Sequence, residues 1–570
     1  MQNYFDVVQD VYGKAIAGAA VAVYDENGNL ATLYSDNIGT LKVNPLSTNS
    51  DGEYDFYAAN GRYSLNIYIT GYASQTKSGI ILFDPAEPDA TADINYLASG
   101  AGAVERTLQE VLQDTVSVKD FGAVGDGVAN DTAAIQAAID AVFADGGGTI
   151  QFPFGRYKVT SQITLRSGVA LYADSQFGAQ ITVATPSITV FSGVNVVNVG
   201  FSGIDFACTA ANVTALDFLN SNRVYLSKIM FYGCLNNVIY DLGGFLSMEN
   251  CASVNSGALK SGRLVLKSSD DTKYGAVFSS IVDYRIENNG AGVQSPAIYC
   301  RRAVGVKITN LLTTNNAAHG NGTCVLIEND CQGITISNGL IVDYDIGVRF
   351  QTGAGINKPP LVNILSHVDF DQCRTNSVLF DSGVGNQIVG GIITSSFVGT
   401  DKQAIVLNAN AGGNAIMGTY VGGYYDPNGA GIYLNGCADN RLFNVQVAGC
   451  YSAVAFNGSV TQTFISTCDF SLNVPNPFVG SFSGAGNRII DIKGYSAANA
   501  VTSPAMPAST VGVTNTFGVA CRVFIFGGTF TVVSINGNTC GNGPNWYLLM
   551  PGEIIAVTYS SAPSWNWVGI

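Results

Sequence analysis

The sequence has little charge and few of the residues that carry metal or nucleic-acid chemistry. Charged residues make up 12% of the 570 residues, and the chain has 2 histidines and 3 tryptophans. The net charge of −15 argues against a basic surface for nucleic-acid phosphates. No apolar run reaches the roughly 20 residues needed to cross a bilayer. We therefore expect neither a nucleic-acid partner nor membrane insertion.

The cysteines follow no metal-binding or disulfide pattern. The chain has 12 of them, scattered from Cys208 to Cys540 without a Cys-x-x-Cys pair. The first residues, Met1 to Asp6, lack the basic and apolar regions of a secretory signal. These features predict assembly in a reducing cytoplasm, where the thiols are buried as small hydrophobic groups. Neither a metal nor another cofactor is expected.

The composition is instead rich in strand and turn residues. Gly accounts for 66 of the 570 residues, and short β-branched runs recur between Gly and Asn, which is typical of strands joined by turns. A chain of this length exceeds one compact core, so several units are expected. Residues 1–97 contain short alternating strands and Asn-Gly turns, such as Asn27-Gly28 and Asn60-Gly61. They predict an antiparallel β-sandwich.

Residues 98–116 are expected to form a helical neck. They begin with a flexible Ser- and Gly-containing join. Val104, Leu108, Val111 and Thr115 then follow 4-3-4 spacing, which predicts one amphipathic helix of about three turns. A helix this short needs a packing partner, either the following unit or copies of itself.

The most informative stretch runs from Ser117 to Phe152. Its sequence Ser-Val-Lys-Asp-Phe-Gly-Ala-Val-Gly-Asp-Gly is followed by Asn-Asp-Thr, an Ala-rich run and Gly-Gly-Gly-Thr-Ile. It resembles the start of the pectate-lyase-like, right-handed parallel β-helices of bacteriophage tailspikes and of polysaccharide lyases and hydrolases. The resemblance predicts that a solenoid begins here.

The polar residues of this start segment are expected to have structural roles. Asn130 or Asp131 can cap a helix from Thr132 to Ala144, which would cover the open end of the solenoid. We likewise expect Asp120 and Asp126 in caps and turns rather than in catalysis.

A strand motif recurs from about residue 150 to 495. Each copy is a mostly apolar run that ends in a polar residue, and the mean spacing is roughly 26 residues, a solenoid period. The final residues of the copies are Asn220, Asp241, Lys267, Arg301, Glu328, Gln351, Asp381, Asn408, Asn435 and Asn457. A second strand family lies between them. The pattern predicts an all-β fold in which residues 117–495 form a parallel β-helix of about ten or more coils.

Residues 496–570 lose this repeat. Runs such as Arg522–Phe526, Thr529–Val533 and Glu553–Tyr559 predict antiparallel strands. Met550-Pro551-Gly552-Glu553 and the final segment, Ser561 to Gly569, resemble the small C-terminal β domains of phage tail proteins, which assist trimerisation or contact glycan. All three tryptophans fall in this part of the chain and are expected mainly in its core: Trp546, Trp565 and Trp567.

Glycosidic hydrolysis requires paired carboxylates, and the richest acidic pattern spans two neighbouring coils. If Val342, Tyr344, Ile346, Val368 and Phe370 face inward, the acids between them project outward on one sheet. These predicted catalytic residues are Asp343, Asp345, Asp369 and Asp371. Crowded carboxylates favour the protonated form that a general acid needs. The alternative is a solvated acidic face.

A competing site is the mixed-charge part of the strand-end series. It comprises Arg301, Glu328, Gln351 and Asp381, with Glu328 as a predicted catalytic carboxylate and Arg301 as a substrate-binding cation. The strand ends that follow predict a ladder of turn amides, for which structure suffices: Asn408, Asn435 and Asn457.

Further substrate-binding residues are predicted around the aspartates. Tyr344 and His367 lie beside them in sequence, and Asp283 occupies an earlier copy of the same pattern. The alternative reaction, β-elimination on a uronate, needs a base and a charge-neutralising cation. His319 and either Arg301 or Arg302 are candidates for these roles.

The resemblance implies a homotrimeric phage tailspike, assembled in the host cytoplasm and carried on the virion. Its N-terminal sandwich resembles the carboxypeptidase-regulatory-like sandwiches that attach phage tail proteins to the particle, so it is expected to attach to the phage tail or baseplate, with the neck on the threefold axis. An appended sandwich with no assigned partner is the alternative. Its β-helix is expected to bind and depolymerise a capsular or lipopolysaccharide glycan, by hydrolysis in preference to β-elimination. A non-catalytic receptor-binding spike and a bacterial exopolysaccharide-modifying enzyme are the alternatives.

Overall fold

The computed structural model divides into two compact units, Met1–Val116 and Ser117–Ile570. No helix among the described residues is long and apolar enough to span a membrane. The described residues are 1–83, 95–175, 177–255, 262–288, 296–315, 322–355, 357–396, 402–424, 428–472, 474–482, 484–495, 501–517 and 519–569.

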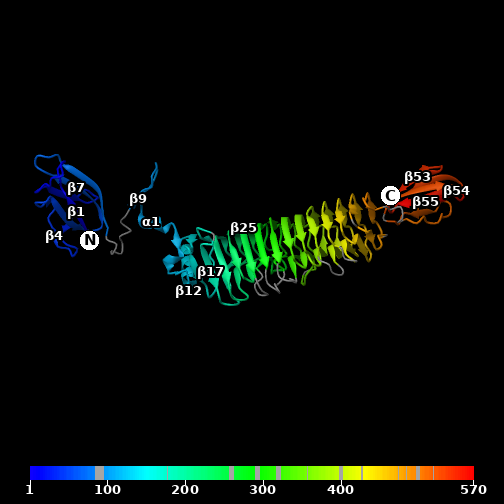
Figure 1. Ribbon diagram of the computed structural model, residues 1–570, viewed down its shortest axis with the longest axis horizontal. Helices are drawn as coiled ribbons and strands as arrows, with labels where there is room; N and C mark the ends of the chain where they lie inside the picture. The colour runs from blue at the N-terminus through cyan, green and yellow to red at the C-terminus, as the bar shows by residue number, and fades with distance from the viewer. Residues whose placement is uncertain are drawn as a thin grey trace. The chain divides into compact units, whose positions relative to one another are not determined.

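The first unit is a β-sandwich of two antiparallel four-stranded sheets, β1-β6-β3-β4 and β5-β2-β7-β8 (Figure 1). Val21 and Leu65 from one sheet and Phe56 from the other are 0% exposed and share one core. The strands are β1 (Gln2–Val7), β2 (Ala20–Tyr24), β3 (Leu33–Tyr34), β4 (Leu41–Lys42), β5 (Leu46–Ser47), β6 (Glu53–Ala58), β7 (Gly61–Tyr68) and β8 (Gln75–Leu82).

The neck helix is shorter than the sequence spacing predicts, so the expectation of three turns is wrong. The N–H of Glu110 donates to Thr107 Oγ1 at 3.1 Å, and the N–H of Thr107 donates to the Glu110 carboxylate at 2.8 Å. This reciprocal cap starts the helix after Thr107, and Val104 is left 76% exposed. The elements of this segment are β9 (Asn95–Tyr96), β10 (Arg106–Thr107) and α1 (Leu108–Gln113).

A helix closes the start of the second unit, as the sequence predicts. α2 spans Thr132–Ala144, and Ile135 and Ile139 on its inner face are fully buried. Asn130 Oδ1 accepts the N–H of Thr132 at 3.2 Å, which satisfies one of the free donors at the helix start.

The acids of the start segment have the structural roles that the sequence predicts. Asp120 completes a capping box with Ser117 at the 3₁₀ helix η1 (Val118–Phe121). Asp126 accepts two backbone N–H groups of the following turn. Asp131, which is 1% exposed, accepts the N–H of Val124 at 2.7 Å.

The following strands coil into a parallel β-helix made of two sheets. Among the described residues, the larger sheet, here called sheet I, has 25 strands, and the smaller, sheet II, has 13. The strands of sheet II are β15 (Ile163–Thr164), β18 (Thr189–Val194), β21 (Thr214–Leu219), β24 (Asn236–Asp241), β26 (Arg263–Lys267), β28 (Ile298–Arg301), β31 (Thr323–Glu328), β33 (Ile346–Gln351), β35 (Asn376–Val384), β38 (Gln403–Gly412), β41 (Ala430–Asn435), β44 (Ser452–Asn457) and β47 (Asn476–Val479).

Sheet I contributes two strands, or one long bent strand, to most coils. Its strands are β11 (Val116–Ser117), β12 (Asp126–Asn130), β13 (Gly148–Gln151), β14 (Gly155–Lys158), β16 (Val169–Tyr172), β17 (Ala179–Val183), β19 (Val197–Ser202), β20 (Ile204–Cys208), β22 (Asn222–Ser227), β23 (Met230–Tyr232), β25 (Gly244–Asn255), β27 (Ser280–Asn288), β29 (Lys307–Thr309), β30 (Leu312–Asn315), β32 (Thr335–Val342), β34 (Ile364–Asp371), β36 (Gln387–Val389), β37 (Ile392–Thr394), β39 (Ala415–Met417), β40 (Tyr420–Gly422), β42 (Arg441–Phe443), β43 (Gln446–Ala448), β45 (Phe464–Ser466), β46 (Asp469–Leu472) and β48 (Arg488–Ile490).

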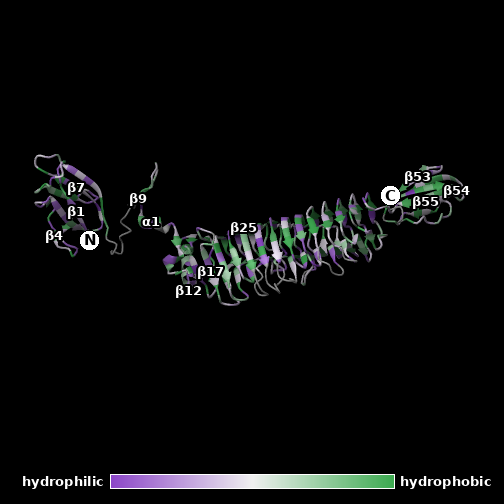
Figure 2. Ribbon diagram, viewed as in Figure 1, coloured by the Kyte–Doolittle hydropathy of each residue, from purple (hydrophilic) through white to green (hydrophobic). Residues whose placement is uncertain are grey.

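The register repeats from coil to coil, so equivalent residues form columns along the solenoid (Figure 2). Inward columns stack like on like: the rings of Phe350 and Phe380 lie 4.6 Å apart and nearly parallel. Outward columns carry the polar residues, because successive side chains of a strand point to opposite faces. The prediction of an all-β fold with a parallel β-helix of ten or more coils is therefore confirmed.

Sheet I bends at a column of residues in the left-handed backbone conformation. Its members include Asn250, Asp283, Asn310, Asn338, His367, Asn444 and Thr467, with φ between 51° and 56°. Asn and Asp tolerate this conformation better than most side chains. The bend separates each coil's part of sheet I into two outward surfaces.

The C-terminal strands form two antiparallel sheets, β49-β54-β51-β52 and β53-β50-β55. Trp565 and Trp567 are 7% and 2% exposed, as expected for core residues, whereas Trp546 is 49% exposed and packs on Phe524. The strands are β49 (Gly512–Thr514), β50 (Cys521–Phe526), β51 (Thr529–Ile535), β52 (Asn538–Gly541), β53 (Asn545–Leu549), β54 (Ile554–Ser561) and β55 (Ser564–Gly569).

One buried acid predicts a pH dependence of solenoid stability. Asp205 on β20 is 1% exposed, and burial raises its pKa from 3.8 to about 6, against a hydrogen bond from the Met230 N–H. The native state therefore holds this proton to a higher pH than the unfolded chain does. Stability from this group is full below pH 3.8 and falls as the pH rises through about 6.

We expect Asp205→Asn to raise the stability at pH 7 by about 1–3 kcal/mol, because the amide is neutral and still accepts the Met230 hydrogen bond. Thermal melting between pH 5 and pH 8 measures this gain, which should grow with pH. Asp174→Asn, at an exposed position, is the matched control. An unchanged melting temperature of Asp205→Asn at pH 8 would contradict the assignment.

Candidate functional site

The polar ends of the sheet II strands form one continuous outward column, here called the strand-end column. Pairing places Asp241 beside Lys267, Lys267 beside Arg301, Arg301 beside Glu328 and Glu328 beside Gln351. The mixed-charge column that the sequence suggested therefore exists in the fold.

Glu328 lies at the centre of the charged part of this column and is 9% exposed. The hydroxyl of Tyr299 donates to Glu328 Oε2 at 2.5 Å, and the side-chain amide of Gln351 donates to Oε1 at 3.0 Å. A Cβ on Gly353 would lie 1.8 Å from Oε1, so a larger residue at this position would displace the carboxylate from where it lies. The carboxylate is thus fixed from two sides beneath a glycine.

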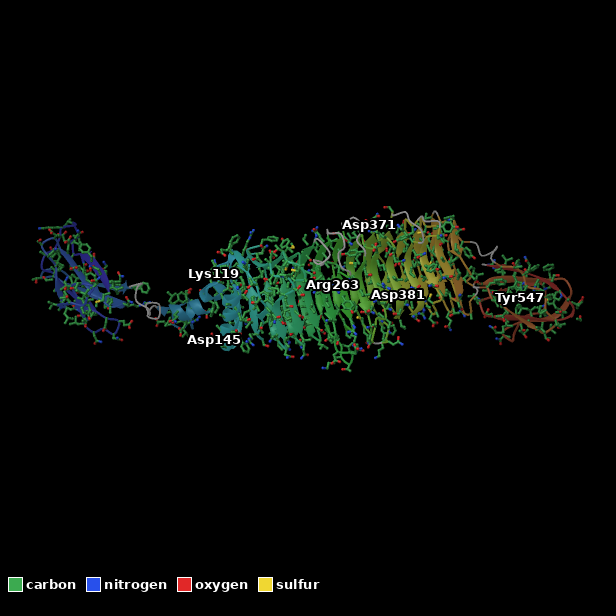
Figure 3. The ribbon with its side chains drawn as sticks, turned by 90° about the horizontal axis from the view of Figure 1, so that it is seen from below. Lys119, Asp145, Arg263, Asp371, Asp381 and Tyr547 are labelled. Atoms are coloured by element: carbon green, nitrogen blue, oxygen red, sulfur yellow. The ribbon has the colours of Figure 1, made fainter. Side chains whose placement is uncertain are left out.

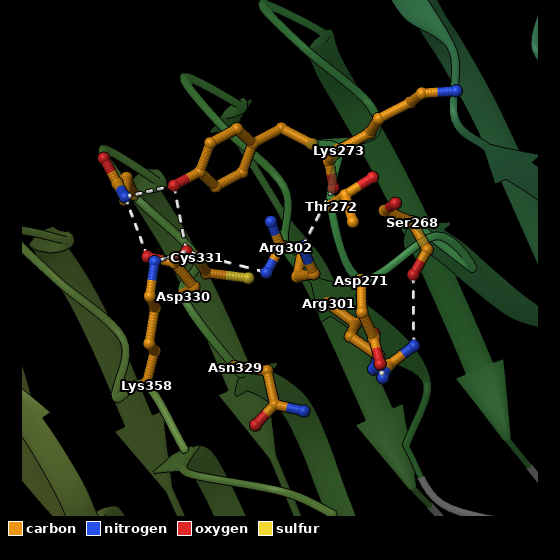
Figure 4. Close-up of polar contacts among 12 residues, drawn as sticks. Ser268, Asp271, Thr272, Lys273, Arg301, Arg302, Asn329, Asp330, Cys331 and Lys358 are labelled. Atoms are coloured by element: carbon orange, nitrogen blue, oxygen red, sulfur yellow. Dashed lines mark hydrogen bonds and ion pairs between the residues drawn. The ribbon is translucent and has the colours of Figure 1, made fainter. Parts of the chain in front are cut away.

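Arg301, which is beside Glu328 in the strand register, binds a second carboxylate from a turn. Its Nη2 donates to Asp271 Oδ1 at 3.0 Å and its Nη1 donates to the carbonyl of Ser268 at 3.1 Å (Figure 4). A Cβ on Gly355 would lie 3.6 Å from Asp271 Oδ2. Glu328 and Asp271 therefore border the same short segment of chain, two residues apart along it.

A buried charged cluster supports the turn that carries this segment. Asp330 and Arg302 have side chains that are 2% and 5% exposed, with an N–O distance of 3.7 Å (Figure 4). The Arg302 guanidinium also lies 4.9 Å from the ring centre of Tyr274. Tyr274 and Gln332 donate hydrogen bonds to the Asp330 carboxylate at 2.9 and 2.8 Å. The cluster therefore satisfies Asp330 with neutral donors and a cation.

Burial is the main cause of the pKa shifts on this face. Burial is the main factor that raises the pKa of Tyr299, and the carboxylate of Glu328 raises it further. Burial also raises the pKa of Asp217, with Lys267 opposing and Asp241 adding to the effect. The pKa of Arg263 is lowered by burial. Tyr299 consequently remains a proton donor to Glu328 at neutral pH.

The later part of the strand-end column is the amide ladder that the sequence predicts. Asn457 donates to Asn435 at 3.0 Å, Asn435 donates to Asn408 at 3.0 Å, and Asn408 donates to Asp381 at 2.9 Å. Asp381 is also paired with Arg349 at 2.5 Å. The ladder ends at Asp381, where the charged part of the column begins.

The four predicted aspartates, here called the aspartates of sheet I, lie on β34 (Asp369 and Asp371) or in the turn that follows β32 (Asp343 and Asp345). They are half-buried, and each carboxylate has a protein partner. Asp345 accepts the N–H of Gly322 at 2.8 Å, and Asp369 accepts the N–H of Ile392 at 2.8 Å. The remaining partners are Thr394 for Asp371, at 3.2 Å, and Arg374 for Asp343, at 4.0 Å. These contacts join neighbouring coils.

The expected alternation of side chains is wrong at two strands. On β32 the buried residue is Ile341 and Val342 is half-buried, and on β33 Ile346 is half-buried while Val348 is fully buried. Tyr344, Val368 and Phe370 are buried, as predicted. Asp343 follows β32 in the left-handed conformation, with φ of 68°, and this turn resets the alternation. Figure 3 labels Asp371 on sheet I and, on sheet II, Asp381.

The predicted substrate-binding residues are spread over several surfaces. Asp283 and His367 both lie in the bend column of sheet I, so Asp283 does not extend the Asp371 column as the sequence pattern suggested. Tyr344 is 3% exposed, which leaves its ring unavailable to a glycan. His319 lies outside the described residues. Of this set, Arg301 is the one that the structure places beside Glu328.

Sequence reasoning missed several residues of this face. Tyr299 was detectable, because it precedes Arg301 by two positions and therefore shares its outward face. Asp217 interrupts an apolar strand, which was also a signal. Asp271 and Gly353 come from turns, where no period predicts which side chains meet.

The charged part of the strand-end column provides the groups that carbohydrate chemistry uses. It offers the fixed carboxylate of Glu328 and a second carboxylate, Asp271, that is paired with Arg301. The hydroxyl of Tyr299 and the amide of Gln351 are hydrogen-bond donors. Such a set suits hydrogen bonding to sugar hydroxyls and acid–base chemistry at a glycosidic oxygen.

Comparisons with known proteins find similarity over parts of the chain. Residues 115–349 match the family described as rhamnogalacturonase A/epimerase, pectate lyase-like. The mannuronan C5-epimerase AlgE5 of Azotobacter vinelandii is 68% identical over 44 residues, which cover 8% of this chain and 4% of the epimerase. The plasmin and fibronectin-binding protein A of Streptococcus pneumoniae is 38% identical over 96 residues, 16% of this chain and 12% of that protein. The chain thus spans a small part of these relatives.

Among solved structures, the tailspike protein of E. coli bacteriophage HK620, as a double mutant, aligns with a TM-score of 0.49 and 15% identity. The alignment covers 85% of this chain and 97% of the tailspike. The solenoid is a parallel β-helix by its own strand pairing, and its part from residue 115 to 349 is similar to the family named above.

Proposed function

We propose that this chain is a phage tailspike whose β-helix binds and depolymerises a bacterial surface polysaccharide, a capsule or an O-antigen. The proposal assigns glycan cleavage to the charged part of the strand-end column. The observation that carries it is Glu328, a carboxylate held by Tyr299 and Gln351 in register with Arg301. The match of residues 115–349 to a pectate-lyase-like family supports a carbohydrate substrate.

Hydrolysis is the reaction that this set of groups suits best. A water adds to the anomeric carbon, the glycosidic C–O bond breaks, and the leaving oxygen takes a proton, which requires two carboxyl groups. Asp381 follows Glu328 by two coils, roughly 9–10 Å along the axis at about 4.8 Å per strand. This is close to the separation that inverting enzymes use, about 6.5–9.5 Å. Asp271, which is paired with Arg301, is the alternative to Asp381 as the second carboxyl group.

β-Elimination is the second candidate reaction, and it is favoured by the short but strong similarity to an epimerase named for mannuronan. Elimination and epimerisation both begin with removal of a proton next to a uronate carboxyl group. The tyrosine that contacts Glu328 is poorly suited to this step, because burial raises the pKa of Tyr299 and keeps its hydroxyl protonated. Hydrolysis is therefore preferred to β-elimination.

The remaining parts of the proposal concern assembly. We assign virion attachment to the sandwich of residues 1–97 and place a homotrimer around the neck, with the C-terminal domain assisting trimerisation or contacting glycan. The aspartates of sheet I, Asp343, Asp345, Asp369 and Asp371, are the alternative catalytic set. A non-catalytic receptor-binding spike is the alternative to an enzyme.

The test is incubation of the purified chain with a panel of bacterial capsular polysaccharides and O-antigens. We expect at least one polymer to fall in size on gel filtration and to yield new reducing ends without ultraviolet-absorbing unsaturated uronates. Absorbing products would assign elimination instead. A polymer that binds the chain and keeps its size over days would favour the non-catalytic spike.

A further inference from the structure

A depression lies on the outward face of sheet II, nearer the C-terminal end than Glu328. Its volume is about 440 Å³, within the range of about 300–1,000 Å³ that small-molecule sites occupy. Its lining includes Gln403, Tyr433, Tyr451, Ala455 and Asn457.

The depression exists because a small residue stands between larger ones. Ala455 occupies the middle of an outward column, with Tyr433 beside it in the preceding coil and Val479 beside it in the next. Ala455 forms the floor, and Tyr451, which is 39% exposed, lies at the edge where β44 begins. The fold therefore sets two tyrosine side chains around a shallow hollow.

The chemistry of the lining is uncharged and rich in amides. Gln403, Asn428 and Asn457 each carry both a donor and an acceptor group, which suits sugar hydroxyls. Tyrosine rings offer apolar faces for the C–H surfaces of a pyranose ring and a hydroxyl at their tip. The lining side chains in the described residues include no acid and no base.

The depression lies on the same face as Glu328 and is reached along one set of consecutive strands. From β31 the order is β33, β35, β38, β41 and β44. Tyr433 on β41 is therefore four coils from Glu328, roughly 19 Å at about 4.8 Å per strand. A glycan several sugar units long, lying parallel to the axis, reaches both places.

We infer that this depression is a distal subsite for an uncharged sugar unit of the glycan that the strand-end column cleaves, an inference that rests on the proposed function. Tyr433 and Tyr451 are the stacking platforms, and Asn457 and Gln403 hydrogen bond the hydroxyls. The subsite fixes a neutral unit several residues from the cleaved bond and makes long chains better ligands than short ones.

Saturation-transfer NMR with a mixture of glucose, galactose, mannose and N-acetylglucosamine tests the subsite without any cleavage. We expect transfer to at least one sugar, reduced about tenfold or more in Tyr433→Ala and Tyr451→Ala, as for loss of a central aromatic contact. Tyr225→Ala, on sheet I and 54% exposed, is the matched control and should bind like the wild type. Equal transfer in all variants would overturn the inference.

Two further outcomes separate this inference from the proposed function. Sugar binding that depends on Tyr433 in a protein that cleaves no polymer would refute the cleavage proposal and retain the neutral subsite. Cleavage that is unchanged in KM on long polymer in both tyrosine variants would refute the subsite alone. If Tyr433→Ala lowers the oligomeric state in sedimentation, the depression is a contact between copies and the inference is wrong.

Discussion

Glu328→Gln is expected to lower the rate of polysaccharide cleavage about 10²- to 10⁴-fold, the range typical of losing a positioned acid–base group. Glutamine keeps the size of the side chain, and its carbonyl oxygen still accepts the hydrogen bond from Tyr299. Its amide cannot ionise or transfer a proton, so the chemistry is lost while the coil remains intact. The initial rate of reducing-end formation on a cleaved polymer measures the effect.

The aspartates of sheet I provide the matched comparison for this variant. Asn substitutions at Asp343, Asp345, Asp369 and Asp371 remove a charge of the same sign without touching the strand-end column. We expect each to keep more than about a tenth of the activity. Full activity in Glu328→Gln together with a large loss in any of these four would place the catalytic site on sheet I.

Asp330→Ala is expected to lower the free energy of unfolding by about 3–5 kcal/mol, because it leaves the buried guanidinium of Arg302 without a partner charge. The side chains of both residues are at least 95% buried, with exposures of 2% and 5%. Tyr274 and Gln332 would also lose their acceptor. The midpoint of thermal or denaturant unfolding, followed by circular dichroism, measures the loss.

Two variants establish whether charge or packing causes the effect. Asp270→Asn changes the neighbouring ion pair between Asp270 and Lys273, whose side chains are 31% and 69% exposed. Because exposed ion pairs contribute little, this variant should be far less destabilised than Asp330→Ala. Replacing both buried partners by apolar residues, Arg302→Met with Asp330→Leu, should cost less than Asp330→Ala alone. If the double variant were the least stable, an unpaired charge would not be the cause.

Asp330 is expected to make stability depend on pH in the direction opposite to that of Asp205. Burial acts to raise the pKa of Asp330, but hydrogen bonds from Gln332 and Tyr274 and the charge of Lys358 lower it below 3.8 overall. A carboxyl group with a lowered pKa stabilises the fold above its unfolded value and loses this contribution as the pH falls through the folded value. The stability difference between Asp330→Ala and the wild type should therefore shrink in acid.

Much of the fold was predictable from the sequence because each coil of a solenoid repeats the same sequence pattern. Each copy ends in a polar residue after an apolar run, so the sheet II strands and their register could be inferred from the spacing of these runs. The neck was less predictable, since a single capping contact between Thr107 and Glu110 shortened the helix. Local hydrogen bonding there competes with a spacing rule that counts apolar residues alone.

The candidate site was predictable in part. Arg301 and Glu328 belong to the repeat, and so their proximity could be inferred from spacing. The preference for the aspartates of sheet I assumed strict alternation through Asp343, which the left-handed turn at that residue interrupts. Asp271 and Gly353 lie next to the strand-end column but belong to the segments between strands. These segments do not follow the repeat, so the spacing of residues in the sequence could not predict their contacts.

The placement of the tryptophans decides what an optical experiment on this protein observes. All 3 tryptophans lie between residues 546 and 567, in the C-terminal sheets. Tryptophan emission therefore reports the C-terminal domain and none of the coils, whereas far-ultraviolet circular dichroism is dominated by the solenoid strands. The two signals therefore report on two different parts of the chain. Unfolding curves from tryptophan emission and circular dichroism that do not coincide would show that these parts unfold in separate steps.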